Sequence, residues 1–504
     1  MLAVIVFIIA INPACALAIK RADYIRRRNL WLGITVAVFL ANDYWVYIIV
    51  VAMLLAYASL KDKSKVALFF FVLFAVPLIP NEIRGFGSAN LLFAVDYAKL
   101  LGLVVLFPAI FSIRQEAERA SFGRMATDKF LIGYLIIQYA LILKVDSATN
   151  AFRVGIFYPF LGVFLPYFIA SRTLNTLEKF REAMMSFVIA TLLLSAIAVF
   201  EFLKHWLLYK QLEVSFEVDW SINKHLLRAG DLRATASTGQ PIALGFAITV
   251  GIGFLLFFKP FIPNRGSWQL GMLLLLAGLM ATLSRGPWVG AAVLLFVLLM
   301  TEANPVRKLA KAMVIVGVLL LLGLASPMGG KIMNFLPWVG NLDQENVAYR
   351  EALLEKTIVL IMKNPFFGSR HFILDSEMQD LALGSGFVDI VNTYARVAMS
   401  NGLLGLVFFI GCLFTVITGV FTTMRGSKNK NDEIYRLGQI LLSALISIAF
   451  MISTVSSVTV IPLIYWSVIG MGVGYILMAR HLHKQDIIIE SHGNSMLQPS
   501  QKRN

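Results

Sequence analysis

Cysteine and histidine are scarce in this sequence, and their positions exclude several kinds of site. The chain has two cysteines, Cys15 and Cys412, and each lies inside an apolar run. Two isolated cysteines form neither a disulfide framework nor a cysteine-based metal site. The six histidines are scattered and show no metal-ligand spacing. The sequence therefore predicts no bound metal and no cofactor.

Charge is also scarce, and acidic charge more so than basic. Charged residues make up 14% of the chain, whereas a soluble domain has roughly 25%. The 44 Lys and Arg residues outnumber the 29 Asp and Glu residues, which gives a net charge of +15. The basic residues lie in short segments between apolar runs, where membrane topology places them. No basic patch is interleaved with exposed aromatic residues, so nucleic acid is not an expected partner.

Apolar runs dominate the rest of the sequence. Hydrophobic residues make up 58% of the chain and occur in runs sized for a bilayer, which a helix of roughly 20 residues crosses. We predict an all-α fold, a polytopic integral membrane helical bundle of about 12–15 membrane segments with a large external loop subdomain. The apolar segments are 1–19, 30–40, 43–59, 65–80, 91–112, 129–143, 152–171, 184–206, 237–258, 268–284, 287–301, 311–326, 397–422, 437–455 and 459–478.

The basic clusters between these segments predict the orientation of the chain, because Lys and Arg concentrate in cytoplasmic loops. The orientation alternates consistently only if residues 30–59 cross twice as a hairpin turning at Asn42-Asp43, although a shallow re-entrant pair is an alternative. Residues 1–19 are then an uncleaved first helix that begins outside. The clusters expected in cytoplasmic loops are Arg26–Arg28, Lys61/Lys63/Lys65, Arg114/Arg119/Arg124, Arg172/Lys179/Arg181, Lys259/Arg265, Arg307/Lys308/Lys311 and Arg425/Lys428/Lys430.

This topology divides the chain into five regions and places two long loops outside. Within the larger loop, residues 347–363 predict a helix with Leu354, Ile358 and Ile361 on one face, which suits the membrane interface. Pro365 is expected to end it. The regions are 1–183, N-terminal membrane helices; 184–326, membrane helices with the external loop 207–236 and the outer turn Ser284–Trp288; 327–396, the large external loop; 397–479, C-terminal membrane helices; and 480–504, a disordered cytoplasmic tail.

Arginines on the outer side are the leading candidates for function. Arg228 and Arg233 precede an apolar segment, and Arg285 lies in the tight outer turn Ser284–Trp288. A guanidinium is a planar fork of donors that suits phosphate oxygens, and Gly286 allows a ligand to approach the backbone closely. The alternative for each arginine is that it reaches the headgroups or pairs with a carboxylate. A tight outer turn gains nothing topologically from a positive charge, which favours function for Arg285.

A second group of polar residues lies between Gly386 and Arg396. If a helix begins there, Asp389, Asn392 and Arg396 share one face. The carboxylate can accept a proton from a sugar hydroxyl, and the amide can orient that hydroxyl. The alternative is that Asp389 caps or charges a helix N-terminus, and spacing alone favours this alternative.

Asp96 and Lys99 form a charged pair three residues apart inside an apolar run. Charges within a membrane segment are candidates for function by default. A neutralising structural pair is the alternative, and we favour it here.

Four short motifs follow one another in a fixed order. Their order, their outer placement and the large final loop resemble the O-antigen ligase and O-antigen polymerase superfamily over roughly residues 185–425. The motifs are Arg233-Ala-Thr-Ala-Ser-Thr-Gly-Gln-Pro241; Ser284-Arg-Gly-Pro-Trp288; Arg350 followed by Lys363-Asn-Pro-Phe-Phe-Gly368; and Asn392-Thr-Tyr394 with Gly402-Leu-Leu-Gly405.

The resemblance implies a chemistry and a set of residues. Members of this superfamily transfer or polymerise glycans carried on undecaprenyl diphosphate, at the periplasmic face of the bacterial inner membrane and without a metal. An acceptor sugar hydroxyl attacks the anomeric carbon of the carried glycan. Carried over by position, Arg233 and Arg285 hold the diphosphate and stabilise charge on the leaving group, with Arg228 as a third. Further contacts are expected from Arg350, Arg370 and Tyr394.

One position departs from the ligase pattern. Ligases of this superfamily usually have His immediately before the Asn that corresponds to Asn392, and here that residue is Val391. Valine cannot act as a general base, so Asp389 is the nearest substitute. The catalytic residues implied are therefore Arg285, Asp389 and Asn392.

The departure favours a polymerase of exopolysaccharide or O-antigen type. A ligase that attaches glycan to lipid A core or to protein is the first alternative. A transporter of polysaccharide or lipid-linked sugar is the second, although no inverted repeat is detected. The expected partners are an undecaprenyl-diphosphate-linked glycan, membrane lipid, and a flippase and chain-length regulator of the same pathway.

Overall fold

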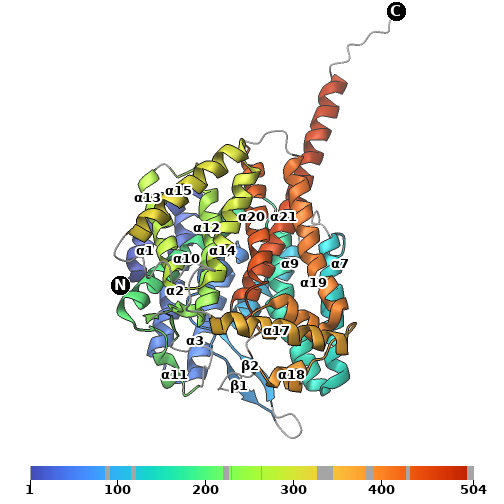
Figure 1. The fold of residues 1–504 in the computed structure, drawn as a ribbon. Coiled ribbons are helices and arrows are strands. Elements are labelled where there is room, and N and C mark those ends of the chain that lie inside the picture. The colour runs from blue at the N-terminus through green and yellow to red at the C-terminus, as the bar shows by residue number, and fades with distance from the viewer. Residues whose placement is uncertain are drawn as a thin grey trace, which may run out of the picture.

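The protein is an α-helical bundle in a computed structural model (Figure 1). The structure describes residues 2–85, 91–114, 121–218, 226–228, 230–262, 264–325, 344–381, 388, 390–426 and 432–496. Among these residues, seven helices are long and apolar enough to cross a membrane, and four apolar helices are shorter. The predicted all-α, polytopic membrane fold is confirmed.

The helices follow one another with little other structure between them. Short π-helical turns at Gly102–Leu106, Ala151–Phe157 and Phe160–Phe164 continue the neighbouring helices. The helices are α1 Leu2–Leu17, α2 Arg21–Leu40, α3 Tyr44–Lys61, α4 Lys65–Val72, α5 Tyr97–Leu101, α6 Ala109–Arg114, α7 Ala126–Val145, α8 Ala148–Asn150, α9 Leu165–Thr173, α10 Leu177–Lys204, α11 Gln211–Ser215, α12 Pro241–Phe257, α13 Arg265–Ala281, α14 Arg285–Thr301, α15 Pro305–Ala325, α17 Gln344–Lys363, α18 Ser376–Gln379, α19 Thr393–Arg425, α20 Glu433–Met451 and α21 Ile461–Met496.

The predicted hairpin at Asn42-Asp43 is present between α2 and α3. The Asp43 carboxylate accepts hydrogen bonds from the backbone N–H groups of Trp45 and Val46 at 2.8 and 2.9 Å, and so caps α3. The apolar run 30–40 suggests a short first arm, but α2 begins at Arg21 and has 20 residues. Length alone does not choose between two crossings and a shallow re-entrant pair, because the first turns of α2 carry Arg21, Asp23 and Arg26–Arg28 and the helix is not among those apolar enough to cross a membrane.

The basic cluster Arg26–Arg28 lies inside α2, not in a loop as predicted. The Arg27 side chain is fully buried, with one nitrogen 2.7 Å from Asp62 and another 2.6 Å from Glu182. A buried guanidinium needs such partners, because an unpaired charge in the interior is strongly destabilising. Arg27 therefore holds α2, the end of α3 and α10 together.

The predicted apolar segments 65–80 and 91–112 are only partly helical. Helix α4 stops at Val72, and the chain then forms an antiparallel pair of strands, β1 (Asn81–Arg84) and β2 (Leu91–Val95). Pro77 and Pro80 lie just before β1 and lack the N–H group that a helix requires. Asp96 caps α5 and forms an ion pair with Lys99, as expected for a structural pair.

The predicted amphipathic helix of the external loop is α17, which lies across the end of the bundle in Figure 1. It packs on a small core of its own, made of Leu353, Leu360, Phe372, Met378, Val388, Ile390 and Met399. At the other end of the molecule, α21 continues to Met496, so residues 480–496 are helical rather than disordered as predicted. Those residues contain no proline, and the only glycine among them is Gly493, so little in the sequence stops the helix earlier.

Two of the sequence motifs interlock at a break in α19. Gly402 has φ 67° and ψ −177°, which interrupts the helix. The backbone of the Pro365–Gly368 motif fills the break: Leu403 N–H donates to the Pro365 carbonyl at 2.7 Å, and Ser369 N–H donates to the Met399 carbonyl at 2.7 Å. The motif thus fixes the end of α17 to a membrane-spanning helix.

Replacing Gly402 with alanine is expected to destabilise the protein by about 2 kcal/mol or more. The position has a positive φ, and an added Cβ would lie 2.2 Å from the carbonyl oxygen of Phe366. The melting temperature of the detergent-purified protein measures the effect. Gly317→Ala in α15 is the control, because a Cβ there meets open space. Equal melting temperatures for the two variants would contradict the interlock.

Candidate functional site

The candidate site is built around the turn between α13 and α14. Helix α13 ends at Ala281 and α14 begins at Arg285, so three residues make the turn. Leu283 in this turn has φ 46°, an unusual conformation for a residue with a side chain. Such strained backbone persists only where the surrounding structure holds it. Arg285, Arg228 and Arg233 are each half-buried.

The segment that carries the other two arginines packs against this turn. Ala234 N–H donates to the Ala281 carbonyl at 3.0 Å. One Nη of Arg228 donates to the Leu283 carbonyl at 2.6 Å. Arg233 donates through Nη2 to the Ser284 hydroxyl at 2.9 Å. The three arginines singled out from the sequence are therefore brought to one turn, although Arg228 and Arg233 lie far from Arg285 along the chain.

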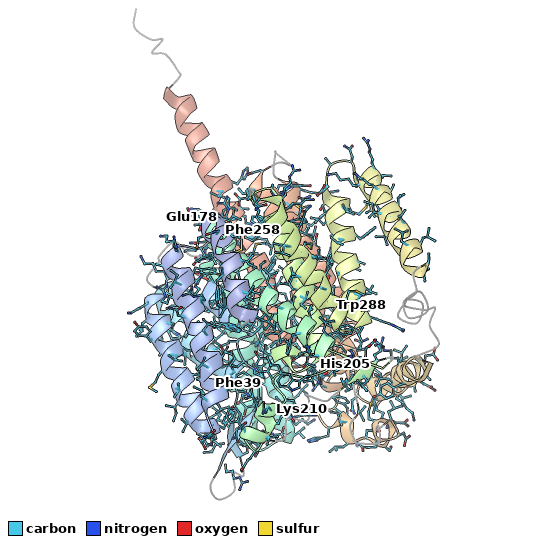
Figure 2. All side chains as sticks on the ribbon, turned by 90° about the vertical axis from the view of Figure 1, so that its left-hand side faces the viewer. Phe39, Glu178, His205, Lys210, Phe258 and Trp288 are labelled. Carbon is cyan, nitrogen blue, oxygen red and sulfur yellow. The ribbon has the colours of Figure 1, made fainter. Side chains whose placement is uncertain are left out.

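Glu201, near the end of α10, holds the arginine-bearing segment in place. Its side chain is fully buried. One carboxylate oxygen accepts hydrogen bonds from the N–H groups of Thr235 at 2.9 Å and Ala236 at 2.8 Å. The other accepts one from Leu208 N–H at 3.0 Å. Figure 2 shows Glu178 and His205 at opposite ends of α10, with His205 toward the end of the bundle that carries α17.

We expect Glu201→Gln to lower glycan transfer about tenfold, the equivalent of 1.4 kcal/mol. Glutamine keeps the size but replaces one accepting oxygen with an NH₂ group that faces an N–H donor. Glycan output in membranes with matched protein levels measures the loss. Glu217→Gln is the control, because Glu217 is exposed in the same outer loop. Wild-type output from the Glu201→Gln enzyme would show that the segment holds its position without the carboxylate.

A segment that the sequence analysis missed connects the turn to the start of α19. The loop after α20 contains Ser453-Thr-Val-Ser-Ser-Val-Thr459. An added Cβ at Gly286 would lie 3.1 Å from the Thr454 hydroxyl, so this loop touches the Arg285 turn. The Thr393 hydroxyl donates to the Val455 carbonyl at 2.8 Å, so the same loop touches α19. Its run of hydroxyl residues between two apolar segments is the signal that sequence reasoning overlooked.

The predicted helical face of Asp389, Asn392 and Arg396 is wrong. Helix α19 begins only at Thr393, because Asn392 is its N-cap and accepts a hydrogen bond from Ala395 N–H at 3.1 Å. Asp389 itself lies outside the described residues. Its neighbours Val388 and Ile390 are both buried.

Part of the chain matches a known protein family. Residues 270–410 match the family model described as O-antigen ligase. The resemblance to the O-antigen ligase and polymerase superfamily is thereby confirmed. The matched region contains the Arg285 turn, α17, the Pro365–Gly368 motif and Asn392. No curated protein matches the chain. The protein is thus similar to O-antigen ligases and polymerases, which indicates a glycan-transferring enzyme in a multi-pass membrane protein.

The other residues carried over from O-antigen ligases and polymerases lie in different surroundings. Arg370 Nε is 2.5 Å from Asp146, the C-cap residue of α7, and so links the segment after α17 to α7. Tyr394 donates its hydroxyl to the Ala449 carbonyl at 2.9 Å. Arg350 is exposed on α17. The structure therefore places Arg228, Arg233 and Arg285 at one turn. The Ser453–Thr459 loop contacts both this turn and Thr393, the residue after Asn392.

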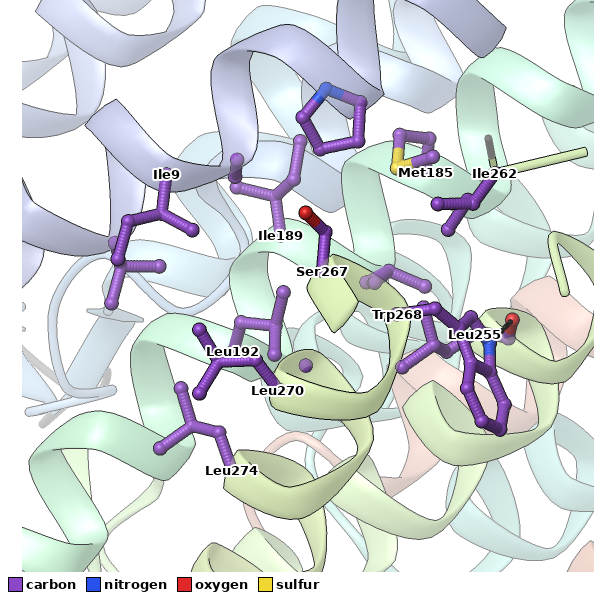
Figure 3. Close-up of a pocket in the computed structure, with 15 residues that line it drawn as sticks. Ile9, Met185, Ile189, Leu192, Leu255, Ile262, Ser267, Trp268, Leu270 and Leu274 are labelled. Carbon is purple, nitrogen blue, oxygen red and sulfur yellow. Dashed lines mark hydrogen bonds between the residues drawn. The ribbon is translucent and has the colours of Figure 1, made fainter. Parts of the chain in front are cut away.

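The apolar cavity shown in Figure 3 is lined by none of the three arginines. This cavity of about 90 Å³ lies between α1, α10 and α13 and has no charged residue in its lining. It reaches Leu192 in α10, nine residues before Glu201, which is about 14 Å along the helix. Among the described residues, no group of His, Cys, Asp or Glu is arranged to hold a metal ion.

Proposed function

We propose that the protein is a glycan polymerase of the bacterial inner membrane. It transfers oligosaccharide units from undecaprenyl diphosphate to an acceptor sugar hydroxyl at the periplasmic face. The observation that carries the proposal is the meeting of Arg228 and Arg233 with the Arg285 turn. Three guanidinium groups at one outer turn suit a diphosphate, since each offers donors in a planar fork.

The proposed reaction is a displacement at the anomeric carbon of the carried glycan. The acceptor oxygen forms a bond to that carbon while the bond to the diphosphate oxygen breaks. Arg233 and Arg285 stabilise the negative charge that develops on the departing undecaprenyl diphosphate, with Arg228 as a third donor. The proton of the acceptor hydroxyl passes to a base, for which we propose Asp389, and Asn392 lies three residues further along the chain.

A ligase is the second candidate, because the matching family model is described as O-antigen ligase. Val391 argues against it, since the histidine usual in ligases is absent from this position. A transporter of lipid-linked sugar remains the third alternative. A flippase that supplies the donor and a regulator of chain length are further partners of the proposed polymerase.

The glycans of a deletion strain test the proposal. A polymerase predicts loss of polymer together with accumulation of single repeat units on the lipid carrier at the periplasmic face. Retained polymer without attachment to its final acceptor would indicate a ligase. Accumulation of lipid-linked units on the cytoplasmic face would indicate a transporter.

A further inference from the structure

Helix α17 has two apolar faces with different surroundings. On one face, Leu353 and Leu360 are 5% and 7% exposed and pack on Phe372 and Met378. On the adjoining face, Leu354, Ile358 and Met362 are 58%, 55% and 72% exposed. These last three residues are four apart, so they form one stripe along the helix.

A third side of α17 carries charged side chains. Lys356 forms ion pairs with Glu377 and Asp380, and Lys363 pairs with Asp375 at 2.9 Å. The helix therefore has a protein face, a side that carries Lys356 and Lys363, and an exposed face on which the apolar stripe is accompanied by the carboxylates of Glu351 and Glu355. This division is typical of a helix that lies in the plane of a membrane interface.

The exposed stripe continues onto the surface of a membrane-spanning helix. Phe366 and Phe367 follow α17 and are 70% and 56% exposed. The backbone links described above place this motif beside Leu403 and Leu404, which donate N–H groups to Pro365 and Phe366. From there an exposed apolar stripe runs along α19 through Leu403, Leu404, Val407, Ile410 and Phe414.

We propose that phospholipid of the outer leaflet covers the stripe of Leu354, Ile358, Met362, Phe366 and Phe367. Because α19 is a candidate membrane span, its exposed apolar stripe faces acyl chains. The stripe on α17 is continuous with that surface and is held to it by the fixed break at Gly402. Two adjacent aromatic residues at the junction fit the depth of the headgroups, where aromatic rings are enriched. This inference does not depend on the proposed enzymatic function.

Collision accessibility of spin labels tests the proposal at single residues. A Cys15→Ala/Cys412→Ala background is labelled at Ile358→Cys and, as a matched control on the side that carries the lysines, at Lys363→Cys, which is also exposed. The protein is reconstituted in vesicles of phosphatidylethanolamine and phosphatidylglycerol, which contain no polyprenyl lipid. We expect the ratio of oxygen to nickel-chelate collisions to be several-fold higher at position 358 than at position 363.

Two results would overturn the proposal. Equal nickel accessibility at both positions would show that the stripe faces water. Weak collisions with both reagents at position 358 would show that protein, such as a second copy of the chain, covers the stripe. Met362→Cys repeats the measurement one turn further along α17, so failure of one variant to fold does not decide the outcome. The melting temperature of each labelled protein confirms that its fold is retained.

Discussion

Replacing Arg285 with lysine is expected to lower glycan output about 100-fold or more, while the amount of protein in the membrane stays unchanged. Lysine keeps the positive charge but loses the planar fork that binds two oxygens at once. Arg285 is the first residue of α14, and its turn is contacted by both Arg228 and Arg233. A lysine there has neither the reach nor the geometry to share a diphosphate with two guanidinium groups.

Arg265→Lys is a closely matched control for this experiment. Arg265 is also the first residue of a membrane helix, α13, but it lies at the opposite end of that helix from the Arg285 turn. A topological role for the two arginines predicts the same small effect from both substitutions. Glycan output from the deletion strain complemented with each variant makes the comparison. Wild-type output from the Arg285→Lys enzyme would show that Arg285 serves only as a topological or structural charge.

Much of the helical architecture can be predicted from the sequence, because the length and composition of an apolar run are local properties. The Asn42-Asp43 turn and α17 are found in this way. The failure at residues 65–80 also has a local cause, because prolines interrupt that apolar run. The failure in α2 does not, since Arg27 is buried in the helix by ion pairs with Asp62 and Glu182, which are distant in the sequence.

A residue of the candidate site can be predicted from the sequence only where its type is unusual at its position. Arginine is costly to place at a tight outer turn without a reason, so Arg285 stands out. Glu201 does not, since its role depends on N–H groups 34 and 35 residues away. The interlock of Gly402 with the Pro365–Gly368 motif also depends on contacts distant in sequence. Hydrophobic periodicity does not predict contacts between residues distant in the sequence, although Gly368 and Gly402 are both part of the motifs shared with the superfamily.

The N-cap of α19 changes how Asp389 is interpreted. Spacing alone favours a capping role for this aspartate. Asn392 fills the capping position instead, with its side chain on Ala395 N–H. The Asn392 cap leaves two roles for the carboxylate of Asp389, one as a charge near the helix N-terminus and one as the proposed general base, and these two roles are separated by substitution.

Asp389→Asn is therefore expected to reduce glycan transfer by about 10²–10⁴-fold while leaving donor binding intact. Asparagine is nearly isosteric with aspartate, so the substitution removes the negative charge with little change in side-chain size. An ordinary carboxylate is a weak base for a sugar hydroxyl. It works if the proton leaves late, in a loose transition state with positive charge on the sugar, as in glycoside hydrolysis.

An assay of the purified Asp389→Asn protein with a polyprenyl-diphosphate-linked donor distinguishes a loss of glycan transfer from a loss of donor binding, because both are measured on the same sample. Asp380→Asn is the control: Asp380 is an exposed aspartate of the same external subdomain, in an ion pair with Lys356. The control is expected to transfer glycan at nearly the wild-type rate, since exposed ion pairs contribute little. An Asp389→Asn enzyme within about threefold of wild type, far short of the loss expected for a missing base, would end the assignment. Catalysis would then rest on the three arginines and on the positioning of the acceptor.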